Sequence, residues 1–227
     1  MKQRVEFKNS HGQKIVGSLF DLGKDFIVIH CHGYGTTKES LTAVSIGEEI
    51  TSKGMSYLCF DFFGSGESDG KINDMTVSSA LDDLSSAIKF LKKIGFINFS
   101  LSGSSFGGGV VLNHATSDKD IRSVALKAPV SDYCSLPLEE LDLTERADDF
   151  LKDAAKYIIY DKAQKILCPV LIIHGDNDTS VPLNQSQKTC SLIKNCSLEV
   201  VKGGNHKLAD HRKKFSSEFA KFFEENK

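Results

Sequence analysis

The feature that most constrains the fold of this chain is a regular alternation of short apolar runs with segments of helical periodicity. Near-continuous apolar runs that end in polar residues or glycine are typical of parallel strands buried on both faces. Such runs are FIVIHCH (26–32), SYLCFDF (56–62), FSLSG (99–103), SVALKA (123–128), VLIIHG (170–175) and LEVVKG (198–203). Two earlier runs, RVEF (4–7) and KIVGSLF (14–20), predict a hairpin at the edge of the sheet.

Helical patterns separate these strands. The clearest is 76–95, where apolar residues recur at helical spacing before Gly95, and weaker patterns cover 38–54, 106–116 and 144–160. A stripe of phenylalanines at 215–223 predicts a last helix that packs on the sheet. The alternation therefore predicts an α/β fold, a mostly parallel eight-stranded sheet with helices on both faces, formed by residues 1–227 as one domain.

Composition narrows the function classes. The chain has 227 residues and a formal net charge of −2, which gives no electrostatic reason to expect nucleic acid or an anionic membrane as a partner. No apolar run approaches the roughly 18 residues of a membrane span. The six cysteines form no C-x-x-C pair, so we expect reduced thiols and no metal site. Together with a polar start, this favours a cytoplasmic protein without a signal peptide.

The stretch Gly103-Ser104-Ser105-Phe106-Gly107 joins a predicted strand to a predicted helix. It fits G-x-S-x-G around Ser105, the pattern of a nucleophile on a sharp strand-to-helix turn. Glycine at 103 and 107 would remove clashes with the neighbouring strand and helix, and only Ser105 is framed in this way. The following helix would begin under the serine, where its free N–H groups favour a developing oxyanion.

A serine hydroxyl needs a neighbouring base that a third group orients. The loop HGDNDTSVP (174–182) offers Asp176 and Asp178, and the loop GGNH (203–206) offers His206. Both loops follow predicted strands, so they should meet Ser105 at the carboxyl edge of the sheet. The order Ser, Asp, His is that of the α/β-hydrolases.

Five successive stretches resemble the landmarks of small serine esterases of the α/β-hydrolase superfamily, in the same order and over nearly the whole chain. They are HGYG (32–35), DFFGSGESDG (61–70), GSSFGG (103–108), HGDNDTSVP (174–182) and GGNH (203–206). The resemblance includes feruloyl and cinnamoyl esterases and relatives of the serine aminopeptidases.

The resemblance implies a catalytic triad of Ser105, Asp178 and His206. Asp178 is chosen because the family's acid lies three residues before the Val-Pro pair. It also implies an oxyanion hole formed by the backbone N–H groups of Tyr34 and Phe106. The reaction expected is cleavage of a carboxylic ester of a small or medium acyl or aromatic acid through an acyl-enzyme, with no cofactor and no metal.

The motifs identify the residues that contact the substrate less directly than they identify the triad. Phe62, Phe63, Leu136 and Val181 fall in loops near the predicted site and are candidates for an apolar pocket. Residues 130–165 form either a short lid or cap insertion or a segment packed on the sheet.

Three other functions stay open at this stage. A thioesterase would use nearly the same chemistry, and GSSFGG (103–108) is also close to the elbows of serine aminopeptidase-like peptidases. A non-catalytic binding or signalling protein on a hydrolase scaffold could keep the triad. The sequence does not specify an oligomeric state.

Overall fold

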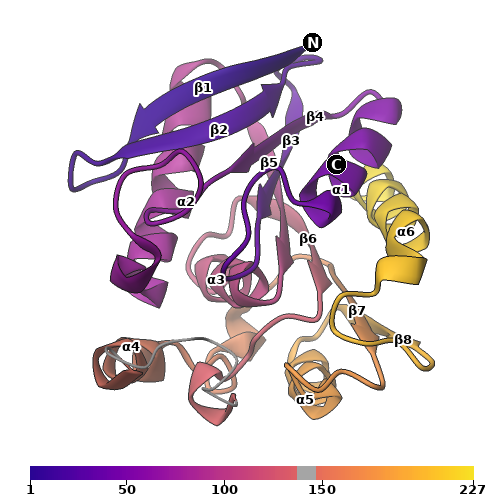
Figure 1. The fold of residues 1–227 in the computed structure, drawn as a ribbon. Coiled ribbons are helices and arrows are strands. Elements are labelled where there is room, and N and C mark those ends of the chain that lie inside the picture. Colours follow the sequence, from indigo (N-terminus) through magenta and orange to yellow (C-terminus); the bar gives the residue numbers. More distant parts are fainter. Residues whose placement is uncertain (137–146) are drawn as a thin grey trace.

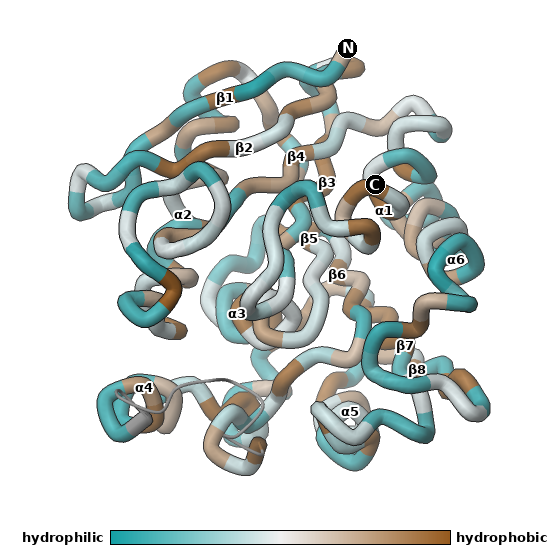
Figure 2. The backbone as a smooth tube through the Cα atoms, viewed as in Figure 1, coloured by the Kyte–Doolittle hydropathy of each residue, from teal (hydrophilic) through white to brown (hydrophobic). Residues whose placement is uncertain are grey.

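The computed structural model describes residues 1–136 and 147–227, and its eight strands there form one sheet in the order β1-β2-β4-β3-β5-β6-β7-β8 (Figure 1). The strands are β1 (Lys2–Lys8), β2 (Lys14–Phe20), β3 (Phe26–Cys31), β4 (Ser56–Phe60), β5 (Asn98–Ser104), β6 (Ile121–Lys127), β7 (Val170–Gly175) and β8 (Cys196–Val201). β1 pairs antiparallel with β2, and β2 antiparallel with β4, while β3 to β8 pair in parallel. The predicted strands, the edge hairpin and the mostly parallel sheet are confirmed. Figure 2 shows hydrophilic residues dominating the edge strand β1.

Two helical layers cover the sheet, as predicted. α1 (Leu41–Ser52) and α6 (Arg212–Glu225) lie side by side on one face, and α2 (Val77–Lys93) and α3 (Phe106–Ala115) cover the other (Figure 1). The other α-helices of the described residues are α4 (Ala147–Ala154) and α5 (Leu183–Leu192). Short 3₁₀ turns are η1 (Ile72–Asp74), η2 (Tyr133–Ser135), η4 (Ala155–Tyr157), η5 (Ala163–Lys165) and η6 (Ala209–His211). No described helix is long and apolar enough to cross a membrane.

Local sequence explains the two best-predicted helices. Thr76 caps α2 by accepting from the N–H of Ser79, and the Ser79 side chain accepts from the N–H of Thr76 in return. In α6 the phenylalanine stripe does pack on the sheet, because Phe215, Phe219 and Phe223 are all buried there.

Two helices depart from expectation. Apolar periodicity does not reveal α5, because the side chains it buries are polar: Gln185, Ser186 and Thr189. Of the helix expected over 144–160, residues 144–146 lie outside the described residues, and α4 covers only Ala147–Ala154. A 3₁₀ turn follows to Tyr157, and Tyr160 lies outside any helix.

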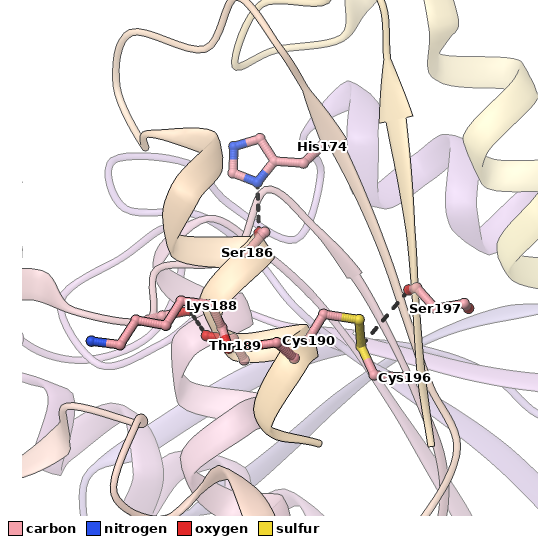
Figure 3. The surroundings of a disulfide bond; sticks show 9 residues. His174, Ser186, Lys188, Thr189, Cys190, Cys196 and Ser197 are labelled. Atoms are coloured by element: carbon pink, nitrogen blue, oxygen red, sulfur yellow. Dashed lines mark hydrogen bonds between the residues drawn. A yellow bond between two sulfur atoms is a disulfide. The ribbon is translucent and has the colours of Figure 1, made fainter. Parts of the chain in front are cut away.

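The expectation of reduced thiols is wrong for one pair of cysteines. Cys190 near the end of α5 is bonded to Cys196 at the start of β8 (Figure 3). The turn between helix and strand brings their Cα atoms to 5.4 Å, a separation that suits a disulfide. The disulfide therefore links the end of α5 covalently to the edge strand β8.

Part of the predicted lid segment, residues 137–146, lies outside the described residues. Of the remainder, α4 is tied to the start of α2. Asp153 accepts hydrogen bonds from the backbone and side chain of Ser78, and the hydroxyls of Ser78 and Tyr157 are 2.7 Å apart. Whether the segment 130–165 acts as a lid stays a prediction.

The turn from β5 into α3 depends on glycine, as the sequence predicts. A Cβ at Gly103 would lie 2.6 Å from the carbonyl oxygen of Gly107. A Cβ at Gly107 would lie 2.3 Å from the carbonyl oxygen of Cys31, at the end of β3. Real Cβ atoms do not approach backbone so closely, so a side chain at either position would push α3 away from the sheet.

We therefore expect Gly107→Ala to lower the free energy of unfolding by about 1–3 kcal/mol, because its clash is with backbone that cannot rotate away. Gly33→Ala is the matched control, since its Cβ would meet only ordinary contacts, the nearest at 3.5 Å. Chemical denaturation of both variants measures the difference. Equal stabilities would contradict the packing argument.

Candidate active site

Ser105 stands at the turn between β5 and α3. Its backbone has φ 52° and ψ −119°, a conformation that non-glycine residues rarely adopt and that is often found at functional sites. The preceding residue, Ser104, still belongs to β5 and is buried. The structure thus distinguishes the two adjacent serines by backbone geometry, and only Ser105 occupies the turn.

His206 connects the serine to a carboxylate. It lies between β8 and η6, with its Nε2 atom 3.0 Å from the Ser105 hydroxyl and its Nδ1 atom 2.7 Å from Oδ2 of Asp178. Three residues from loops far apart in the sequence therefore form one hydrogen-bonded chain. These distances suit transfer of a proton from the serine to a histidine that the aspartate orients.

Asp178 lies in the loop after β7, with its side chain shielded from solvent. Its Oδ1 atom accepts from the N–H groups of Ser180 and Val181, at 3.0 and 2.9 Å. Its Oδ2 atom lies 3.1 Å from Nε2 of His174, whose Nδ1 atom contacts Ser186 on α5 (Figure 3). Every partner of this buried carboxylate is a hydrogen-bond donor, so the ionised form is stabilised.

The second candidate acid, Asp176, contacts the backbone of the loop that carries His206. One of its carboxylate oxygens accepts from the N–H of Gly203, 2.6 Å away, in the loop that carries His206. Asp176 therefore ties the two loops together and does not contact the histidine ring.

Electrostatics keeps the pair in the protonation states that base catalysis needs. Burial alone would raise the pKa of Asp178, but hydrogen bonds from His174 and His206 outweigh it and hold that pKa well below its usual range. Burial lowers the pKa of His206, assisted by the positive charge of Lys127 and opposed by the hydrogen bond to Asp178. The imidazole is therefore neutral, and able to accept a proton, at neutral pH.

The loop after β3 lies against the serine, because a Cβ at Gly33 would be 3.5 Å from the Cβ of Ser105. The Gly33 carbonyl accepts from Nδ1 of His32 at 2.8 Å and from the hydroxyl of Thr36 at 2.8 Å. Since Nε2 of His32 accepts from the N–H of Phe62, the proton of this ring is on Nδ1. These bonds fix the peptide plane whose other end is the Tyr34 N–H.

A similar constraint acts on Phe106, the first residue of α3. The Ser105 carbonyl accepts from the N–H of Val130 at 3.0 Å and from those of Gly108 and Gly109. The same peptide unit carries the Phe106 N–H, which has no intrahelical acceptor because it opens the helix.

A salt-bridge network braces the loop after β3 against the loop after β4. The buried carboxylate of Asp61 accepts from the backbone N–H of Lys38 and from its ammonium group, both at 2.7 Å. The N–H of Glu67 donates to the same carboxylate, and the Glu67 side chain also binds the Lys38 ammonium. The DFFGSGESDG stretch (61–70) thus positions the loop that carries Tyr34.

A cavity of about 480 Å³ opens beside Ser105 and His206. Apolar and aromatic side chains form one part of its wall: Tyr34, Phe106, Val130, Tyr133, Leu136, Phe150 and Val181. Leu136 and Val181 are thus among the lining residues, but Phe62 and Phe63 are not. Phe62 is fully buried in the core below Phe106, with ring centroids 5.9 Å apart. The N–H of Phe63 is tied to Asp83 on α2, and its ring packs on the same core.

Sequence reasoning missed a polar part of the cavity wall. Lys127 ends β6, and its ammonium group donates to the carbonyl of His206 at 2.7 Å. Arg212, in the basic run HRKK (211–214), also lines the cavity. A lysine in an otherwise apolar strand run was the available signal. No cluster of three or more metal-binding side chains occurs in residues 1–136 and 147–227.

Comparisons with known proteins agree with this architecture. The chain is 27% identical over 214 residues to a mouse protein named palmitoyl-protein thioesterase ABHD10, mitochondrial, covering 83% of this chain and 71% of that one. Its fold is similar to that of Est1E from Butyrivibrio proteoclasticus, solved with ferulic acid, with a TM-score of 0.89, 24% identity and 98% of each chain covered. It is also similar to the Pyrococcus furiosus esterase Pf2001, with a TM-score of 0.82, 21% identity, and 99% of this chain and 92% of that one covered.

A family model supplies the broader assignment. The model described as the prolyl oligopeptidase family matches residues 44–226, which include the elbow and both loops that meet it. Because the match covers most of its length, the chain belongs to the prolyl oligopeptidase family and is a serine hydrolase of the α/β-hydrolase superfamily.

Proposed function

We propose that the protein hydrolyses carboxylic esters of small or medium acyl or aromatic acids through a covalent acyl-enzyme. The observation that carries this proposal is the unbroken chain of hydrogen bonds from the Ser105 hydroxyl through His206 to Asp178, at the edge of a cavity. Ser105 is the nucleophile, His206 the general base and acid, and Asp178 the group that orients the imidazole.

In the first half of the reaction, the Ser105 oxygen attacks the ester carbonyl while Nε2 of His206 takes its proton. The carbonyl oxygen becomes an oxyanion held by the N–H groups of Tyr34 and Phe106. When the tetrahedral species collapses, the bond to the leaving oxygen breaks and His206 returns the proton to that oxygen. Water, deprotonated by His206, then releases the acid from Ser105 by the same steps.

The wall of the cavity supports an apolar or aromatic acyl group. Tyr34, Phe106, Tyr133 and Phe150 form a connected set of rings in edge contact, with neighbouring centroids 5.6 to 6.5 Å apart. Such a wall favours apolar surface and flat rings over charged groups. The similar fold of Est1E, solved with ferulic acid, is consistent with an aromatic acid.

A thioester is the second candidate. The mouse relative that shares 27% identity is named as a palmitoyl-protein thioesterase. The proposed triad would cleave a thioester by the same steps, with sulfur as the leaving atom.

An aminopeptidase-like activity has less support. Recognition of a substrate's terminal ammonium group calls for a carboxylate, yet none of the described residues lining the cavity is aspartate or glutamate. The cations found there, Lys127, Lys207 and Arg212, would repel an ammonium group.

A substrate panel distinguishes these possibilities. It consists of p-nitrophenyl esters of increasing acyl length, hydroxycinnamate esters, acyl thioesters and aminoacyl amides, compared by kcat/KM. We expect esters with short, medium or aromatic acyl groups to be cleaved fastest. Faster cleavage of long-chain thioesters would favour the second candidate, and turnover of amides alone would contradict both.

We expect Ser105→Ala to lower kcat on the best ester by on the order of 10⁵-fold without changing the thermal unfolding temperature much, because only the attacking oxygen is lost. A fluorophosphonate probe should label the original protein at Ser105 and leave the variant unlabelled. A folded protein that the probe never labels would instead indicate a non-catalytic scaffold.

The pH dependence follows from His206, which acts only when neutral. Its pKa is lowered, so the acid limb of kcat/KM for an uncharged ester should have its midpoint below the ordinary histidine value of about 6.5. Lys127→Met removes a positive charge that contributes to this lowering, so the midpoint should move to higher pH. A midpoint above 6.5 in the original protein, or a downward move in the variant, would contradict the assignment.

A further inference from the structure

The polar part of the cavity wall comes from four separate elements, and we call it the basic subsite: His30 on β3, Ser104 on β5, Lys127 on β6 and Arg212 at the start of α6. His30 pairs in register with Ser102, and Ser104 pairs with Lys127. Because side chains alternate along a strand, Ser102 and Ser104 share a face, so His30, Ser104 and Lys127 point to the same side of the sheet. That side carries α1 and α6 (Figure 1).

The subsite contains polar atoms that the protein leaves without partners. In the described part of the chain, five buried side-chain polar atoms lack a hydrogen bond, and three of them belong to this subsite: Nε2 of His30, Oγ of Ser104 and Nε of Arg212. His30 is 0% exposed and Ser104 5%. A buried polar atom without a partner costs about 1–3 kcal/mol. Their concentration in one cavity gives this part of the wall free hydrogen-bonding capacity for a polar group.

The charge of the subsite shows what kind of partner it would be. Lys127 is 5% exposed, and within the described part of the chain its ammonium group donates a single hydrogen bond, to the His206 carbonyl. Burial lowers the pKa of Lys127 to about 8, opposed by the charge of Asp178, so it is mostly protonated at pH 7. Arg212 is always charged.

Among the described residues that line the cavity, no negative charge balances these two cations. The described lining residues include neither aspartate nor glutamate, and the nearby carboxylate of Asp178 is already bound by His174 and His206. Burial lowers the pKa of His30 to about 3, so its ring is neutral. The first residues of α1 and α6 also line the cavity, and their helix dipoles add positive potential there.

The location of the subsite identifies the part of the substrate that reaches it. The leaving atom receives its proton from His206, so the leaving group lies on the histidine side of the serine. Lys127 binds the backbone of His206, Lys207 is the next residue, and Arg212 opens the helix that follows. The aromatic wall formed by Tyr34, Phe106, Tyr133 and Phe150 is left for the acyl group.

We propose that the basic subsite binds a carboxylate or phosphate carried by the leaving alcohol or thiol of the substrate. This inference rests on the proposed hydrolytic function. It assigns the substrate class as esters or thioesters whose leaving group bears an oxyanion a few atoms from the scissile bond.

The test compares butyryl esters of three alcohols: 4-hydroxybutanoate, its uncharged isostere 4-hydroxybutanamide, and 3-hydroxypropyl phosphate. In all three esters, three methylenes separate the ester oxygen from the terminal carboxylate, amide or phosphate group. The chemical reactivities of the three ester bonds are therefore similar. We expect kcat/KM, measured by release of butyrate at pH 7, to be at least about tenfold higher for one or both anionic esters than for the amide, as a charged hydrogen bond allows. Preference for one anion identifies carboxylate or phosphate as the group bound.

Two substitutions test whether Lys127 and Arg212 cause the preference for the anionic ester. Arg212→Met and Lys127→Met should each reduce the ratio of kcat/KM between the preferred anionic ester and the amide. Lys213→Met is the matched control, because Lys213 is the exposed neighbour of Arg212 and should leave the ratio unchanged. If Lys127→Met does not fold, Arg212→Met at the cavity rim still provides the test.

The outcomes separate this proposal from the one it rests on. Equal or slower cleavage of both anionic esters relative to the amide would overturn the basic subsite while leaving ester hydrolysis intact. A preference that survives both Lys127→Met and Arg212→Met would overturn it as well. Cleavage of no ester, together with no labelling of Ser105 by a fluorophosphonate, would instead overturn the proposed hydrolytic function.

Discussion

The site depends on how the buried carboxylate of Asp178 is held. Two backbone N–H groups bind one of its oxygens, and two histidine rings approach the other. A charge removed from water needs all of these donors, because each missing one would leave a large desolvation penalty. The same arrangement leaves only one orientation for His206, with Nδ1 on the carboxylate and Nε2 toward Ser105.

This orientation is possible because the loops approach one another backbone to backbone. A Cβ at Gly175 would lie 2.1 Å from the carbonyl oxygen of Gly204, where the loop after β7 meets the loop that carries His206. A Cβ at Gly107 would likewise strike the end of β3. Glycine allows these approaches, so the relative positions of serine, histidine and aspartate follow from main-chain packing more than from side-chain contacts.

The balance between local signals and long-range packing explains which parts of the fold and of the site could be predicted from the sequence. The strands and the elbow around Ser105 have local signals, namely apolar runs and two glycines at fixed spacing. The sequence could not predict helix α5 or its buried face, because the side chains that α5 buries are polar. The lysine in the apolar run 123–128 was a local signal, but the placement of Lys127 and Arg212 in the cavity wall, and the burial of Phe62 away from it, depend on strand register and on where α6 begins. Those are properties of the assembled sheet, which no local pattern records.

Lys127 contacts the loop of the candidate catalytic histidine and also lines the basic subsite. A neutral donor could hold the His206 carbonyl without burying a charge, so anchoring the loop does not by itself explain a lysine. Its charge also lowers the pKa of His206 and opposes the imidazolium that forms whenever Ser105 or water gives up a proton. An oxyanion in the basic subsite would offset that repulsion. Binding of a charged leaving group would then stabilise the imidazolium of His206, which must protonate that leaving group. This would explain why a lysine, and not a neutral donor, is buried at position 127.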